Sequence, residues 1–360
     1  MTIPAFAFNV DALFRRAQNA MLWLLAALHI LLFASLLLVL GSLSEANAAT
    51  PVCGGENLLG DLKAEKPGLY EEILSEGSRV PNGKGLFWKV EKTGLAPSYL
   101  LGTMHVSDPR VLKMPPGAAE AQAEASTIVI ESDEILDEKK ATAALLSKPE
   151  LTMFTDGNSI EKLLPKEDVA LLEKGLKQRG IPLAAVSRMK PWMLMAFVSL
   201  PPCELARKAQ NAAFLDKKIA TDAIAAGKQV KGLETLAEQL STMAAIPMDL
   251  HLKSLVETIK LGSRMEDVFE TMTELYLSED IGLTMPLLKA VAPDGTDDQS
   301  GYGEFEELVV VKRNQLMAER AAPILAEGGA FIAVGALHLP GEQGLIELLR
   351  EQGFTVTRAE

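Results

Sequence analysis

The chain is poor in cysteine and has no excess of positive charge. The first shortage argues against a zinc site built on cysteines, and the second argues against nucleic-acid binding. Only two of its 360 residues are cysteine. They form no C-x-x-C pair, so we expect no zinc site built on cysteines. Lysine and arginine number 35 against 48 aspartates and glutamates, which gives a formal net charge of -13. Because nucleic-acid binding needs cations that release counterions from phosphates, nucleic acid is not an expected partner.

Runs of like charge, internal repeats and low-complexity tracts are also missing. Their absence disfavours charged tails and solenoids. Hydrophobic residues make up 48% of the chain, so it can bury a substantial core. We therefore expect a globular protein of one or two domains whose function lies in a folded site.

The first 48 residues have the pattern of an export signal. Arg15 and Arg16 precede an apolar run from 21 to about 40, and an Ala-x-Ala pattern follows at 46–48. We expect residues 1–48 to be a signal peptide. An uncleaved membrane anchor is the alternative, because the run is nearly long enough to cross a bilayer. In both cases the positive-inside rule places the rest of the chain outside the cytoplasm, as a periplasmic or secreted protein, membrane-associated if anchored.

Cys53 and Cys203 both fall in the exported part of the chain. An even pair of cysteines in an oxidising compartment favours a disulfide, which would tie the start of the mature chain to its middle. Two free thiols are the alternative, since the sequence alone does not place the two Cα atoms close together.

Apolar, β-branched segments predict short strands near both ends of the exported chain. They lie at 85–92, 98–102, 127–130, 229–233, 330–334 and 354–357, with helical patterns between them, the last two at 305–327 and 341–351. We expect an α/β fold with a central mixed sheet formed from residues 83–133, 229–234 and 329–358 within one domain of 49–360. The helices of about 134–228 would form an inserted cap or subdomain.

Two of the expected strands run into the same pattern, Gly-x-x-His. The first copy ends at His105 and the second at His338, while two further strands end in Glu131 and Glu234. In open α/β sheets, polar residues just beyond the carboxyl ends of strands face the crevice where ligands bind. We therefore expect both imidazoles to converge with at least one carboxylate.

Imidazole and carboxylate together suit a divalent metal ion, which lowers the pKa of its bound water and makes a nucleophile. The metal ligands would be His105, Glu131 and His338; the identity of the metal is open. Without a metal, a histidine oriented by a glutamate could serve as general base for attack by water. The residues alone leave both possibilities open.

Several segments, in order over nearly the whole mature chain, resemble the TraB/GumN family. They are Gly102–Val106, the strand ending at Glu131, Gly232–Thr235 with Gln239-Leu240, Arg313-Asn314 and Val334–Gly341. The family usually has Glu-Leu-Asp where this chain has Glu131-Ser132-Asp133, so both acids are kept. The resemblance includes the Tiki proteases and implies a fold similar to erythromycin esterase and ChaN-like proteins. It also implies a catalytic site of His105, Glu131 and His338, with Arg313 as an anion stabiliser.

These observations predict an exported, metal-dependent, peptidase-like hydrolase acting on a peptide or another amide or ester. Glu234 and Asn314 are candidate substrate-binding residues. A metal-free hydrolase and a non-catalytic protein that binds a peptide or glycan in the same cleft are the alternatives. By pattern alone, Arg313 and Asn314 would lie on an exposed helix face. Asp216 could lie in the site or on a helix surface. His251 would lie on a helix, at its surface or half-buried.

The leader gives a first prediction. If residues 1–48 are a cleaved signal peptide, protein recovered from the cell envelope begins near Ala49, because signal peptidase cuts after the Ala-x-Ala pattern. Mass spectrometry of the intact protein measures the cut. An uncut N-terminus in the membrane fraction would instead mean that the segment is an anchor.

Overall fold

The computed structural model of the protein describes residues 53–292, 303 and 306–359. The expected leader lies outside these residues. The described residues belong to one compact unit. None of the helices in this part of the chain is long and apolar enough to span a membrane.

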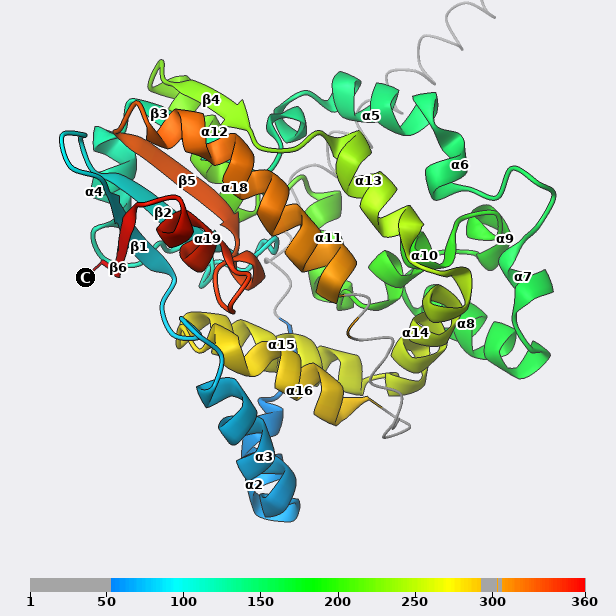
Figure 1. Cartoon of the computed structure of the whole chain (residues 1–360). Helices are drawn as coiled ribbons and strands as arrows, with labels where there is room; N and C mark the ends of the chain where they lie inside the picture. Colours follow the sequence, from blue (N-terminus) through cyan, green and yellow to red (C-terminus); the bar gives the residue numbers. More distant parts are fainter. Residues whose placement is uncertain (1–52, 293–302, 304–305, 360) are drawn as a thin grey trace, which may run out of the picture. The chain divides into compact units, whose positions relative to one another are not determined.

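The core of the fold is a mixed sheet of strands from both ends of the chain (Figure 1). Its strands follow the order β4-β3-β5-β2-β1-β6. β2, β5, β3 and β4 are parallel neighbours, whereas β1 runs antiparallel to β2 and β6. The expected α/β class and mixed sheet are confirmed. The strands are β1 (Phe87–Glu91), β2 (Ser98–Thr103), β3 (Thr127–Ile130), β4 (Gln229–Gly232), β5 (Ala330–Gly335) and β6 (Thr355–Arg358).

Helices cover both faces of the sheet. Successive residues of a strand point to opposite sides, so alternate residues pack against the helices of each face. In β5, Phe331 and Ala333 pack against α4 (Ala118–Glu124) and α12 (Leu215–Ala225). Ile332 and Val334 pack on the other face against α18 (Lys312–Leu325) and α19 (Leu345–Glu351), which lie in front of β5 in Figure 1. A strand buried on both faces reads as the continuous apolar run that the sequence shows.

The long connection between β3 and β4 is helical, as expected. Residues of this connection such as Leu172 and Leu194 form a separate hydrophobic cluster together with Leu255, which follows β4. The connection holds α5 (Glu138–Ser147), α6 (Pro149–Thr152), α7 (Ile160–Leu163), α8 (Lys166–Gln178), α9 (Leu183–Val186), α10 (Pro191–Val198), α11 (Pro202–Ala209) and α12, while α13 (Leu236–Ala245), α14 (Met248–Leu261), α15 (Arg264–Leu277) and α16 (Thr284–Val291) follow β4.

Three features of the helices differ from the expectation or go beyond it. The helix expected from 341 begins only at Leu345, because Gly341 adopts the left-handed φ of +97°. The helix before β5 opens with a π-helical turn, Glu307–Val311. Two helices that the sequence pattern did not indicate, α2 (Leu58–Glu65) and α3 (Pro67–Ser78), pack through their apolar residues against α15 and α16.

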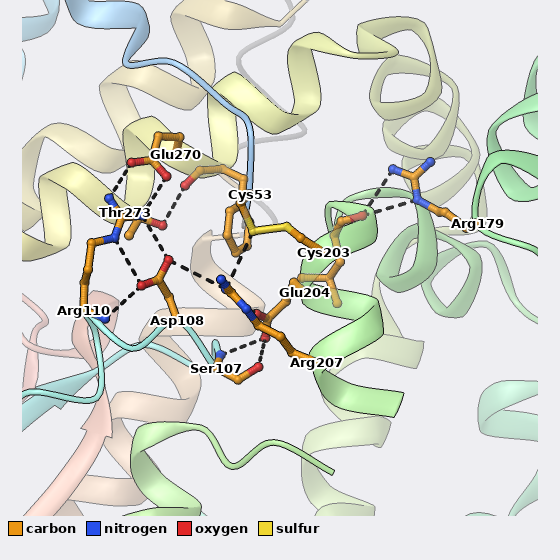
Figure 2. Close-up of a disulfide and its surroundings, with 12 residues drawn as sticks. Cys53, Ser107, Asp108, Arg110, Arg179, Cys203, Glu204, Arg207, Glu270 and Thr273 are labelled. Atoms are coloured by element: carbon orange, nitrogen blue, oxygen red, sulfur yellow. Dashed lines mark hydrogen bonds and ion pairs between the residues drawn. A yellow bond between two sulfur atoms is a disulfide. The ribbon is translucent and has the colours of Figure 1, made fainter. Parts of the chain in front are cut away.

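The expected disulfide between Cys53 and Cys203 is confirmed, with Cα atoms 5.4 Å apart (Figure 2). It joins the segment before α2 to the first turn of α11. Beside it, Nη1 of Arg207 lies 3.7 Å from the sulfur of Cys53 and 3.6 Å from Oε2 of Glu204. Glu204 is fully buried and accepts hydrogen bonds from the amide and hydroxyl of Ser107. The disulfide-linked helix therefore holds the loop that follows β2.

Removing the disulfide tests its contribution. In the double variant Cys53→Ser/Cys203→Ser, we expect the free energy of unfolding to fall by about 2 to 5 kcal/mol, because the bridge closes a loop with a sequence separation of 150 residues in the unfolded chain. Urea denaturation with and without reductant measures it. The variant should be insensitive to reductant, and equal midpoints for the oxidised protein and the variant would contradict the prediction.

Candidate functional site

The strand ends deliver their polar residues to one edge of the sheet. β2 leads to His105, β3 to Glu131, and β5 to His338 through the 3-10 helix Ala336–His338. Nε2 of His105 lies 3.6 Å, and Nε2 of His338 3.8 Å, from the same oxygen of Glu131, Oε1. The structure thus brings together the two histidines and the glutamate, although 232 residues separate the imidazoles in sequence (338 minus 105, less one).

The two Gly-x-x-His glycines have different roles. A Cβ on Gly102 would lie 2.8 Å from Cδ1 of Leu339 and 3.1 Å from Ala336, so this glycine lets the turn carrying His338 pack on β2. A Cβ on Gly335 would instead lie 3.0 Å from Oε1 of Glu131 and 3.5 Å from both imidazoles. The first glycine permits close packing, and the second leaves the centre of the site open.

Glu131 is the centre of the hydrogen-bond network. It is 7% exposed. Its Oε1 accepts a hydrogen bond of 2.6 Å from the amide of Gly335, and its Oε2 accepts from Arg313 at 2.7 Å and from Gln239 at 3.2 Å. Burial alone would raise the pKa of this carboxyl, but His105, together with His338 and Arg313, holds the pKa well below its usual range. Glu131 is therefore a carboxylate.

Arg313 is fixed between two carboxylates. Its Nε and Nη2 donate to Glu234 at 2.7 to 3.1 Å, and Nη2 also donates to Glu131. Its side chain is only 13% exposed, so the exposed helix face indicated by the residue pattern is wrong. Glu234 is buried as well, and its carboxylate forms an ion pair with this arginine. With its guanidinium engaged in this way, Arg313 holds Glu131 in place.

The two imidazoles are oriented from opposite faces of the sheet. Asp216, on α12, accepts a hydrogen bond from the Thr103 hydroxyl and lies 3.1 Å from Nδ1 of His105. Asn314, on α18, has its Oδ1 2.7 Å from Nδ1 of His338, while its amide nitrogen donates to a backbone carbonyl. Each Nδ1–H thus faces an oxygen acceptor, and both Nε2 atoms point toward Glu131.

The histidines differ in charge although their motifs match. Desolvation lowers the pKa of His105, but the negative charge and hydrogen bond of Asp216, with those of Glu131, outweigh it and raise the pKa to about 10. The side chain of His105 is half exposed. Burial is the main cause that lowers the pKa of His338 to about 4. The negative charge of Glu131 would raise this pKa, but the positive charges of Arg313 and His105 oppose it. At neutral pH the structure as it stands holds one imidazolium and one neutral imidazole.

Two further contributors are Asp216, which the sequence left open between the site and a helix surface, and Gln239, which it gave no role. Helical spacing gives a signal for Asp216, because it shares a buried face with Ile219, Ala220 and Ala223. For Gln239 the signal is its place among the segments that resemble the family. His251 is buried, which is more than expected, and its Nε2 lies 2.9 Å from the carbonyl of Met243, so it is a packed helix residue.

The donor set can be compared with a metal site. Within the described ranges, no group of three or more His, Cys, Asp or Glu side chains is arranged so that it could hold a metal ion as it stands. Tetrahedral ligands at about 2.0–2.2 Å from one ion lie roughly 3.4 Å apart, slightly closer than the 3.6 and 3.8 Å found here. His105, Glu131 and His338 supply imidazole and carboxylate donors, which are donor types that divalent ions accept.

Fold and site together define an α/β protein with paired Gly-x-x-His strand ends around a buried glutamate. The chain belongs to the TraB/PrgY/gumN family, whose model matches residues 86–358. It is 24% identical over 318 residues to Metalloprotease TIKI1 of Homo sapiens, which covers 76% of this chain and 61% of the human protein. It is 23% identical over 350 residues to Metalloprotease TIKI2 of Xenopus tropicalis, covering 80% of this chain and 64% of that protein.

The chain thus spans less than two thirds of the length of these curated relatives. No solved structure matches it. The relatives support a distant, protease-like hydrolase, and what this chain acts on is left to the proposal below.

Gly335 offers a test of the site geometry. Its φ of -52° and ψ of 134° suit alanine, so Gly335→Ala should fold. The added Cβ would press on Glu131 and both imidazoles, and we expect the imidazole NMR signals of His105 and His338 to shift while the circular dichroism spectrum is kept. Gly175→Ala is the matched control, because its Cβ would meet nothing within 4 Å. Unchanged imidazole signals in Gly335→Ala would refute the geometry.

Proposed function

We propose that this protein is an exported, metal-dependent hydrolase that cleaves peptide bonds, with His105, Glu131 and His338 as metal ligands. The observation that carries the proposal is that both Nε2 atoms lie within 3.8 Å of Oε1 of Glu131, each on an imidazole whose Nδ1 faces an oxygen acceptor. Metal-binding histidines characteristically have such partners, which set the tautomer and ring orientation. The relatives named metalloproteases support the same chemistry.

A bound divalent ion would supply a water of lowered pKa and polarise the carbonyl of the scissile bond. The chain's own residues prepare the site for it. Asp216 and Asn314 hold the imidazoles from two sides, and Arg313 with Gln239 holds Oε2 of Glu131. Since an imidazole must be neutral to ligate a metal, His105 would release its Nε2 proton on binding.

A peptide outside the cytoplasm is the substrate that best agrees with the rest of the chain. The export pattern of residues 1–48 would carry the site to the periplasm or beyond, with membrane association if that segment is kept as an anchor. The acidic net charge argues against nucleic acid.

One observation favours a second candidate, a hydrolase without metal. His338 is neutral, and its Nδ1 donates to Asn314, so its Nε2 carries a lone pair that could accept a proton from water. His105 is the weaker candidate for this role, because its neighbouring carboxylates keep it protonated at neutral pH.

Metal analysis separates the two candidates. We expect the purified protein to bind about one divalent ion per chain and to lose it, together with peptide cleavage, in the His105→Ala/His338→Ala variant. Asp216→Asn should lower metal affinity by about 10 to 100-fold, because it weakens the partner that orients His105. Elemental analysis and isothermal titration calorimetry measure these changes, and unfolding curves check that each variant is folded.

His251→Gln serves as the control, because it removes an imidazole that lies in a helix and pairs with a carbonyl. It should keep both metal and cleavage. Equal metal content in the wild type and the double variant would rule out the metal site. Cleavage that survives complete removal of metal would favour His338 as general base. Tight peptide binding with no product at any metal content would point to a binding protein.

A further inference from the structure

A pocket of about 250 Å³ opens beside the two imidazoles, and its walls are mainly apolar. His105, His338 and Gly335 form the end of the pocket at the candidate site. Half-buried side chains of Met104, Met272, Val309, Val310 and Leu337 line much of the rest. Apolar side chains left partly uncovered next to a polar centre are typical of a ligand-binding cleft.

The π-helical turn Glu307–Val311 provides one wall of this pocket. It carries Val309 and Val310, and two residues after it Arg313 reaches Glu131. π-helical turns inside α-helices occur frequently at functional sites, because the extra residue shifts the side chains that follow. One helical segment thus supplies both a wall of the pocket and the arginine that holds the central carboxylate.

The charges around the pocket limit what it can accept. Among the described residues that line it, the ionisable ones are His105, His338, Tyr276 and Arg313. Arg313 is paired with Glu234 and Glu131, and burial raises the pKa of Tyr276, so this phenol is neutral. None of these described lining residues is an aspartate or a glutamate. A lysine side chain entering it would lose water without meeting a carboxylate among these residues, and a glutamate could reach a cation only at the imidazole that ends the pocket. An apolar side chain would be favoured along the rest of the walls.

A second, smaller pocket of about 150 Å³ also borders His105. It is lined by residues that include Glu131, Phe214, Asp216 and Gln239, and it is more polar. His105 lines both pockets. Because His105 borders both pockets, a substrate that occupies both has its reacting bond near this imidazole, between a mainly apolar pocket and one whose walls have a larger polar share.

From this asymmetry we propose that the larger pocket binds one apolar side chain of the substrate, directly next to the bond that is cleaved. The proposal rests on the peptidase function proposed above and adds the substrate class: peptides with leucine, methionine or phenylalanine on one defined side of the bond. The two methionines, with flexible and polarisable side chains, allow the pocket to adapt to more than one apolar shape.

Matched peptides test the proposal. The set differs only at the two residues that flank one bond, which are leucine, methionine, phenylalanine, lysine, glutamate or glycine in turn. For the metal-loaded wild type, we expect kcat/KM to be at least about 10-fold higher with an apolar residue than with lysine or glutamate on one side of the bond. Equal rates across the set would overturn the proposal.

Charge placed in the pocket should change this preference. Val310→Glu and Met272→Glu put a carboxylate in the wall, and we expect the ratio of lysine to leucine cleavage to rise by at least about 10-fold. Leu277→Glu is the matched control, because it adds the same charge on the same helix as Met272 at a residue that is 37% exposed and outside the pocket. If Met272→Glu does not fold, the test rests on Val310→Glu. A ratio of lysine to leucine cleavage in Val310→Glu equal to that of the wild type would overturn the proposal.

Binding separates this proposal from the peptidase function on which it rests. Fluorescence anisotropy of the same peptides with the His338→Ala variant reports affinity without turnover. An apolar preference in binding, with no cleavage by the wild type, would support the pocket and reject the peptidase. Cleavage by the wild type with neither a rate nor an affinity preference would reject the pocket and keep the peptidase.

Discussion

A buried negative charge on Glu131 is the constraint around which the site is organised. A carboxylate that is 7% exposed must be paired, because leaving it without partners in the interior would cost several kcal/mol. Its two oxygens receive an amide from the end of β5, an arginine from α18 and a glutamine from α13, and both imidazoles face one of them. The sheet edge and the helices on its faces are thus joined at a single side chain.

The sequence contained most of the information on the strands and on the residues at their ends, and less on the network around them. An apolar run followed by a polar residue indicates a buried parallel strand with a group at its carboxyl edge, and this pattern led to Glu131. The partnership of His105 with Asp216 joins residues 111 apart, and depends on where α12 crosses the sheet, which no local pattern specifies. Arg313 was assigned through the family resemblance, since a helical arginine alone indicates a solvated surface.

The duplicated motif does not produce two equivalent histidines. His105 faces a carboxylate at Nδ1 and is half exposed, whereas His338 faces an amide oxygen and is buried. These environments separate the pKa values of the two imidazoles to about 10 and about 4. Similar sequence at two strand ends therefore sets similar positions, and the covering helices set the chemistry. Pairs of titratable groups with pKa values pushed apart in this way are common where protons are transferred.

The position of β5 has a consequence for how the protein is made. This strand is nearly the last in the chain, yet it lies between β2 and β3, which are not paired with each other. A ribosome that has released β2 and β3 has produced strand edges that await a neighbour about two hundred residues further on, and such edges readily pair with other chains. The two imidazoles can therefore meet only after β5 has been made and has paired with both strands.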